Sequence, residues 1–169
     1  MSAEIESWFA GRLPSDWLAG PAAVTVDRDE LLVVLPIESP AAEGDDAARS
    51  SAIAGRLARF RVETREQRIR IANEAEHRFG RKVSWGASCG DTRALFTTLS
   101  TPVMTRLRQP ERIVLDTLVD AGVARSRSEA LAWCVRLVRQ HSEEWLGELR
   151  EALREVERLR ESGPSAATG

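Results

Sequence analysis

Residues 126–138 carry more apolar side chains than one helix of a small two-helix unit can bury. The segment opens with Ser126 and Glu129 in the S-x-x-E spacing of a capping box, which indicates that a helix starts here. Apolar residues then follow on most of the helix circumference: Leu131, Trp133, Cys134, Val135, Leu137 and Val138. Because such a helix needs cover on nearly every side, we expect a second chain against it. The predicted dimer core consists of Leu118, Leu131, Val135, Val138 and Trp145.

The helical pattern continues past residue 138 as a heptad seam. Its positions are spaced alternately by three and four: Ser142, Trp145, Leu149, Ala152, Val156 and Leu159. That spacing is typical of a coiled coil, and Leu146 and Leu153 widen the apolar face. Since the seam spans only about three heptads, we expect it to extend the dimer or to pack on the rest of the chain. Residues 163–169 are predicted to be disordered.

A shorter helix is predicted before the helix that starts at Ser126. Pro110 suits a first helical turn because it has no backbone amide to leave unpaired there, and Gly122 suits a helix C-terminus. An extended segment, residues 103–108, precedes the helix. Within the helix, five residues form a broad apolar face of the kind that packs into a core: Ile113, Val114, Leu115, Leu118 and Val119. Residues 101–162 are thus predicted to form one helical dimerisation module.

The order of extended segment, helix, glycine turn and an R-S-R-S-E-A-L opening of a second helix resembles the ribbon-helix-helix family of bacterial repressors and antitoxins. The resemblance covers residues 102–138. It implies that two chains pair their strands into an antiparallel ribbon that enters the major groove of DNA. It also implies that Val103, Thr105 and Leu107 face the protein core. The side chains implied to read bases are Met104, Arg106 and Arg108.

These implied contacts have a physical basis. Strand side chains alternate between two faces, and an outward arginine can donate two hydrogen bonds to guanine. Phosphate is expected at the N-terminus of the second helix, where backbone amides point outward. The residues implied to contact it are Arg125, Ser126, Arg127 and Ser128. A module that dimerises without forming the ribbon would contain the same helices. The alternative that this module only dimerises and does not bind DNA therefore stays open.

Residues 1–100 are predicted to form a small α+β domain. Helical turns are expected within 3–10, and the apolar runs 23–26 and 31–37 flank a D-R-D-E turn, which indicates a hairpin. The stretch 38–50 contains small and acidic residues without aromatic or branched aliphatic ones. That composition predicts a disordered loop.

A long helix is predicted over residues 51–79, where apolar residues recur mostly at three- and four-residue steps and Gly80 follows as a stop. A strand over 82–88 and a short apolar connector come next. The predicted fold class is therefore α+β, with a hairpin, a long helix and a strand followed by the helical module.

Charge is segregated along the chain. Residues 1–48 contain ten acidic residues against two arginines, whereas residues 49–82 contain ten basic residues against four glutamates. Guanidinium groups suit phosphate contacts, so the helix over 51–79 is a candidate auxiliary surface for nucleic acid. Its candidate residues are Arg56, Arg59, Arg65 and Arg68. An ordinary solvated helix face, interleaved with glutamates, explains the same charges.

No catalytic site is predicted. Cys89 in S-C-G-D would need a base, and His77 and His141 are the only histidines. Cys89 and Cys134 lack the spacing of a zinc cluster. We therefore expect no enzyme, no metal and no cofactor. The longest apolar run is far shorter than the roughly 20 residues of a membrane span, so we expect a cytoplasmic protein without membrane contact.

These features together predict a homodimeric DNA-binding transcriptional regulator. One alternative is a non-enzymatic adaptor that only dimerises through the module. It would contact a protein partner through the N-terminal domain, either with the basic helix over 51–79 or with the region of Trp8 and Trp17. The other is an RNA- or ribosome-associated protein that uses the basic helix over 51–79. A steep salt dependence of DNA or heparin binding would favour nucleic acid over the adaptor.

Overall fold

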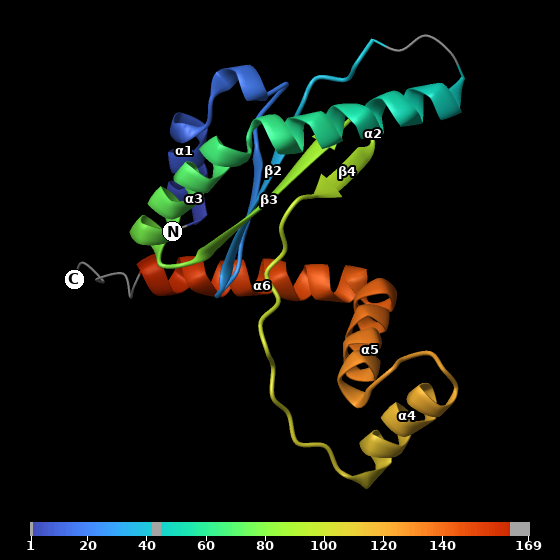
Figure 1. Cartoon of the computed structure of the whole chain (residues 1–169). Helices are drawn as coiled ribbons and strands as arrows, with labels where there is room; N and C mark the ends of the chain where they lie inside the picture. Colours follow the sequence, from blue (N-terminus) through green and yellow to red (C-terminus); the bar gives the residue numbers. More distant parts are fainter. Residues whose placement is uncertain (1, 42–44, 163–169) are drawn as a thin grey trace, which may run out of the picture. The chain divides into compact units, whose positions relative to one another are not determined.

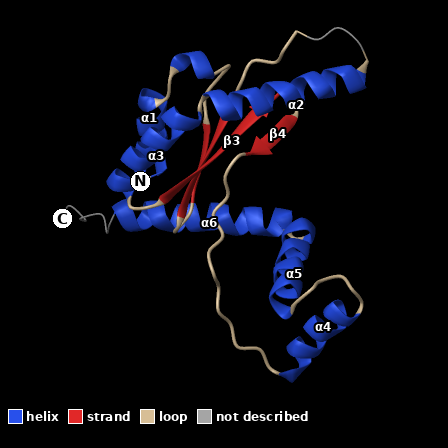
Figure 2. Ribbon diagram, in the orientation of Figure 1, coloured by secondary structure: helices blue, strands red, loops and turns tan. Residues whose placement is uncertain are grey.

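The structure is a computed structural model that describes residues 2–41 and 45–162. The chain divides into two units, residues 1–103 and 104–169, where the sequence predicts a boundary at residue 100. The described residues contain four strands and six α-helices (Figure 2). This composition confirms the α+β class. No helix among the described residues combines the length and the apolar character needed to cross a membrane.

The first unit is built on a four-stranded sheet in the order β1-β2-β3-β4 (Figure 1). The strands are β1 (Ala23–Val26), β2 (Glu30–Pro36), β3 (Lys82–Cys89) and β4 (Thr92–Leu95). The outer pairs are antiparallel, and the central pair, β2 with β3, is parallel. The predicted hairpin and the predicted strand are therefore confirmed. Strand β4 falls where the sequence predicts only a connector.

Local side-chain bonding explains the β1–β2 turn. The Asp27 carboxylate accepts hydrogen bonds from the backbone amides of Asp29 and Glu30, at 2.8 and 2.7 Å. Aspartate side chains favour turns because they bond to nearby backbone in this way. The β3–β4 turn uses Gly90, whose φ of 57° lies in the left-handed region that favours glycine.

Three α-helices complete the first unit: α1 (Ser2–Arg12), α2 (Asp46–Glu63) and α3 (Arg65–Phe79). A short 3-10 turn, Ser15–Trp17, follows α1. The prediction of helical turns near the N-terminus is confirmed by α1. The prediction of a single long helix over 51–79 is wrong, because the chain forms two helices there.

The break between α2 and α3 lies at Thr64, a buried residue. Its hydroxyl donates a 2.6 Å hydrogen bond to the Phe60 carbonyl oxygen, and its amide bonds to the same oxygen at 3.1 Å. A threonine that bonds backward to the preceding turn bends a helix. The start of α2 is also earlier than predicted, since Asp45 caps it by accepting from the Ala48 amide. The predicted disordered loop over 38–50 is thus helical from residue 46, while residues 42–44 lie outside the described part.

The main core lies between the helices and one face of the sheet. Side chains alternate along a strand, and the buried face is formed by odd-numbered residues: Leu31, Val33, Leu35, Ile37, Trp85, Ala87 and Cys89. The aromatic ring of Phe9 on α1 meets Trp85 edge to face, with 6.2 Å between ring centroids. Helices α2 and α3 add Leu57, Phe60 and Ile71 to the same core.

The second unit contains α4 (Gln109–Asp120), α5 (Arg127–His141) and α6 (Glu143–Ser162). Its core is small: among the described residues of this unit, Leu115, Ala124 and Ala130 are the buried side chains that form it. The helical pattern predicted to run on beyond residue 138 is interrupted at Ser142, which separates α5 from α6. The tail predicted to be disordered, 163–169, lies outside the described residues.

Candidate nucleic-acid interface

The segment implied to form the ribbon, residues 103–108, has no strand partner within the described part of the chain. Met104 is 94% exposed, and Arg106 and Arg108 are exposed as well. Val103 and Thr105, implied to face inward, are also exposed. Because a β-ladder needs a second strand, the two-chain ribbon stays a prediction.

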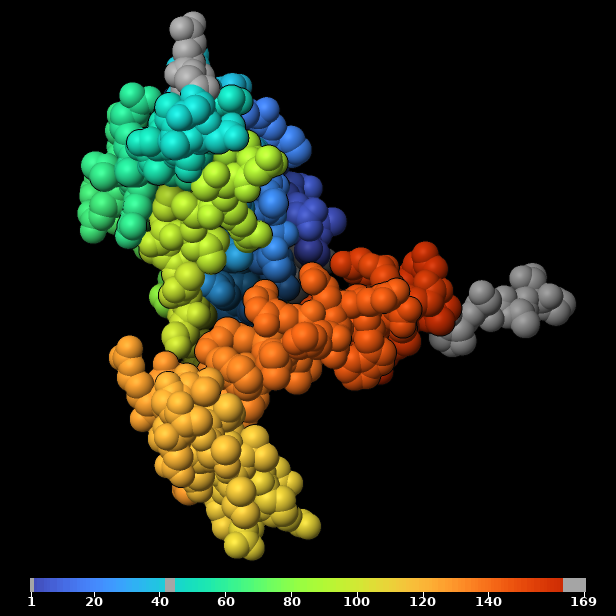
Figure 3. Space-filling view, turned by 90° about the vertical axis from the view of Figure 1, so that its right-hand side faces the viewer, coloured from blue at the N-terminus to red at the C-terminus, as the bar shows by residue number. Residues whose placement is uncertain are grey.

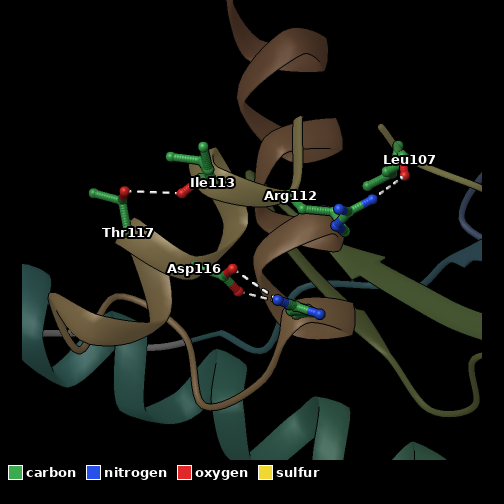
Figure 4. Close-up of polar contacts among 6 residues, drawn as sticks. Leu107, Arg112, Ile113, Asp116 and Thr117 are labelled. Carbon is green, nitrogen blue, oxygen red and sulfur yellow. Dashed lines mark hydrogen bonds and ion pairs between the residues drawn. The ribbon is translucent and has the colours of Figure 1, made fainter. Parts of the chain in front are cut away.

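The C-terminal end of this segment is attached to α4. Leu107 is half-buried and packs on the small core of the second unit. Its carbonyl oxygen accepts a 2.9 Å hydrogen bond from Nη1 of Arg112, one turn into α4 (Figure 4). Arg108 then caps α4 with extended backbone angles, and Pro110 occupies the first turn as predicted. Arg106 and Arg108 therefore flank an anchored residue.

The apolar face predicted on α4 is only partly buried. Leu115 is buried, and Leu118 and Val119 pack beside it. Ile113 and Val114 remain more than half exposed. Within one chain α5 covers only one side of α4, so the burial of Ile113 and Val114 stays a prediction.

The turn between α4 and α5 is closed by backbone bonding. Gly122 has a φ of 73°, and it follows Ala121, the C-cap of α4, as the sequence predicts. The amides of Val123 and Ala124 both bond to the Leu118 carbonyl oxygen, at 2.9 and 3.3 Å. This turn directs the N-terminus of α5 back toward α4.

The N-terminus of α5 is capped by two side chains. The Ser126 hydroxyl accepts a 3.2 Å hydrogen bond from the Glu129 amide, which confirms Ser126 as the N-cap. The Glu129 carboxylate instead accepts from the Arg125 amide at 2.8 Å, one residue before the position expected in a capping box. The first-turn amides of Arg127 and Ser128 have no intrahelical acceptor by helix geometry. All four residues implied to contact phosphate are exposed at this end.

Arg127 also joins the two helices. Its Nε and Nη2 donate to the two carboxylate oxygens of Asp116 on α4, at 2.6 and 2.7 Å (Figure 4). This pairing lowers the pKa of Asp116 below its ordinary value and raises the pKa of Arg127. In the single chain, the Arg127 guanidinium is therefore directed to a carboxylate.

The sequence predictions missed both arginine contacts of α4. Asp116 and Arg112 carry no periodic signal that distinguishes them from ordinary exposed charges. The Arg127–Asp116 contact depends on the turn bringing α5 against α4, which residue spacing alone does not specify.

One of the four arginines predicted to form a basic surface on the first unit is not at the surface. Arg68 is only 5% exposed, so its assignment to a nucleic-acid surface is wrong. Its guanidinium carbon lies 4.9 Å from the centre of the Phe96 ring, and its nitrogens bond to the Thr64 hydroxyl and the Arg61 carbonyl. Burial and the neighbouring arginines lower its pKa. Arg68 supports the break between α2 and α3.

The other three arginines remain at least partly exposed. Arg59 lies 3.7 Å from Glu63 and Arg65 lies 2.8 Å from Glu66, so carboxylates offset both charges. Arg56 lies over the Phe60 ring at 5.6 Å. These contacts are typical of an ordinary solvated helix face interleaved with glutamates, the alternative explanation of its charges.

Cys89 is fully buried against Ser39, with 3.6 Å between sulfur and hydroxyl oxygen. His77 and His141 are both exposed. Over residues 2–41 and 45–162, no group of three or more histidine, cysteine, aspartate or glutamate side chains is placed to hold a metal ion.

Residues 3–95 match the family described as "Rv1265-like protein, N-terminal domain", and residues 108–160 match the family described as "Mb1296 C-terminal domain". Neither match is to ribbon-helix-helix proteins, so that resemblance stays a prediction. Two relatives are the uncharacterized proteins Rv1265 of Mycobacterium tuberculosis and Mb1296 of Mycobacterium bovis. Each is 61% identical over 160 residues, which cover 93% of this chain and 69% of the relative. No solved structure matches the chain. Because the first match alone spans more than half of the sequence, the chain belongs to the Rv1265-like family.

Proposed function

We propose that this protein is a dimeric DNA-binding transcriptional regulator that acts in the cytoplasm through residues 102–138. The observation that supports this best is the exposed segment 103–108, which is anchored at Leu107 and leads directly into α4, a tight turn and α5. An anchored, exposed segment can pair with its copy from a second chain and present alternate side chains outward.

In this function, the paired segments enter the major groove. Arg106 and Arg108 donate pairs of hydrogen bonds to guanine, and Met104 makes apolar contact with thymine methyl groups. The N-terminus of α5 contacts the flanking phosphates through the amides of Arg127 and Ser128. Arg125, exposed beside this end, adds positive charge.

The second unit has the exposed apolar surface that a dimer requires. Val135 on α5 is 63% exposed, and Val138 and Trp145 are more than half exposed too. Leu118 and Leu131, by contrast, already pack in the unit's own small core. Covering the exposed side chains with a second copy would remove apolar surface from water, which stabilises the association.

The first test is the salt dependence of DNA binding by the full chain. Duplexes selected from a random pool would be titrated by fluorescence anisotropy at several salt concentrations. We expect affinity to fall steeply as salt rises, because phosphate contacts release counterions. A chain that binds neither the selected duplexes nor heparin would contradict the function and favour the adaptor.

An RNA function through α2 and α3 makes a different prediction. It requires that Arg59→Ala and Arg65→Ala weaken nucleic-acid binding, whereas the proposed function requires both variants to bind DNA like the wild type. If Arg59→Ala and Arg65→Ala abolished DNA binding, that result would count against residues 102–138 as the DNA interface.

A further inference from the structure

Helix α6 has an apolar face that its own unit does not cover. None of its residues is buried, although five large apolar side chains lie along one side. Their exposed fractions run from 41% to 61%: Trp145, Leu149, Leu153, Val156 and Leu159. In the space-filling view, α5 and α6 form the orange to red surface (Figure 3). A stable helix with this much exposed apolar surface is typical of a partner-binding helix.

The spacing of these residues fits pairing with another helix of the same kind. Leu149 and Val156 take one seam position of a heptad, and Trp145, Ala152 and Leu159 take the other. Among parallel coiled coils, a β-branched residue at the first position and leucine at the second favour two strands. Val156 and Leu159 form such a pair in the last heptad. The polar face carries ion pairs within the helix, Arg154 with Glu151 and Arg158 with Glu155. The helix therefore has one apolar side and one solvated side.

The charges beside the seam distinguish the two directions of pairing. In a parallel pair, Glu155 lies beside Arg160 of the second copy, because flanking positions five residues apart meet across the seam. In an antiparallel pair, Glu155 lies instead beside Glu148 of the second copy. The parallel pair gains two attractive contacts by symmetry, whereas the antiparallel pair gains two repulsive ones.

We propose that α6 pairs in parallel with α6 of a second copy of this chain, with Leu149, Val156 and Leu159 in the seam and Glu155 beside the second copy's Arg160. The inference rests on the proposed function, because it specifies how the two halves of that dimer are joined. The contacts between the two α6 helices do not involve DNA, so the pairing can be tested in the absence of DNA.

The direction is tested by cysteine cross-linking of the full chain in a Cys134→Ser background, where the remaining Cys89 is buried. A parallel seam places two copies of residue 159 together near one end. We expect Leu159→Cys alone to form a covalent dimer under mild oxidation. Arg150→Cys, on the solvated side, serves as the matched control and should not. Cross-linking of Leu159→Cys only when mixed with Trp145→Cys would show an antiparallel pair and overturn the proposal.

The flanking charges give an independent test by sedimentation equilibrium. Glu155→Arg should weaken dimerisation by about threefold, because two exposed ion pairs become repulsive, and the double variant Glu155→Arg/Arg160→Glu should restore it. In an antiparallel pair, Glu155→Arg would instead strengthen dimerisation, since the introduced guanidinium would meet Glu148. Leu149→Asp should weaken the dimer at least about tenfold, through loss of one buried leucine from each copy.

The two proposals fail separately in these experiments. A chain that cross-links through Leu159→Cys but binds no DNA retains the α6 pair and loses the proposed function. A chain that binds the selected duplexes as a dimer, yet cross-links only in the antiparallel arrangement, retains the function and loses the α6 pair. A chain that is monomeric contradicts both proposals.

Discussion

The Arg127 guanidinium and the Asp116 carboxylate face each other across α5 and α4, with two hydrogen bonds of 2.6 and 2.7 Å. Both side chains are about half exposed. The pair stands beside the helix end proposed to contact phosphate. Asp116 therefore fixes the orientation of Arg127 and at the same time offsets the charge that would attract DNA.

Replacing Asp116 by asparagine should strengthen DNA binding. The change leaves a side chain of the same shape and removes one negative charge beside the phosphate site, so we expect affinity to rise by about threefold at low salt. Anisotropy titrations of wild type and Asp116→Asn measure the ratio, with Asp91→Asn in the first unit as the control. Weaker binding by Asp116→Asn would show that orientation of Arg127 matters more than charge.

The same pair should make stability depend on pH in the acid range. Arg127 lowers the pKa of Asp116 in the folded chain, so the ionised carboxylate stabilises the fold above its unfolded-state pKa. That contribution is lost as pH falls through the lowered folded-state pKa. The thermal midpoint of the wild type should exceed that of Asp116→Asn at neutral pH, and the gap should close in acid. A gap that stays constant with pH would exclude this origin.

Gly86 on β3 is expected to tolerate no side chain. A Cβ atom there would lie 2.9 Å from both the Ala94 carbonyl oxygen and a methyl carbon of Leu95. We expect Gly86→Ala to lower the free energy of unfolding by about 1–3 kcal/mol, measured by urea denaturation. Gly55→Ala on α2 should instead raise it by about 0.5–1 kcal/mol, because beyond the adjacent residues and the helix's own backbone nothing lies within 4 Å of an added Cβ. Equal effects at both glycines would contradict the close approach of β4.

Arg68 should contribute to stability and not to nucleic-acid binding. Replacing it by alanine removes two hydrogen bonds and the contact with Phe96, so we expect a loss of about 2 kcal/mol in the free energy of unfolding. Arg65→Ala, on the exposed side of the same helix, should change that free energy by less than about 1 kcal/mol. Unaltered stability in Arg68→Ala would restore Arg68 as a candidate surface residue.

Elements with a strong local signal could be predicted from the sequence. Pro110 and Gly122 mark the two ends of α4, and Ser126 marks the start of α5 because its side chain bonds to the backbone three residues later. The β1–β2 hairpin followed from its two apolar runs and the turn at Asp27. These signals depend on residues close in sequence, so periodicity and capping were sufficient.

Other features depend on contacts between distant residues. Arg68 is buried because Phe96, which comes after β4, lies under its guanidinium. The helix break at Thr64 depends on the same buried arginine, which donates to the threonine hydroxyl. In each case the local pattern was consistent with the wrong environment.

The proposed function depends above all on Arg106 reading bases in a dimer. The most direct test compares selected and scrambled duplexes at one fixed salt concentration, for wild type, Arg106→Ala and the control Arg28→Ala, which removes the same charge from the first unit. We predict that Arg106→Ala loses about 1–3 kcal/mol of discrimination between the duplexes, remains a dimer by sedimentation, and that Arg28→Ala keeps the wild-type preference. A preference for the selected duplex that is unchanged in Arg106→Ala would contradict the claim.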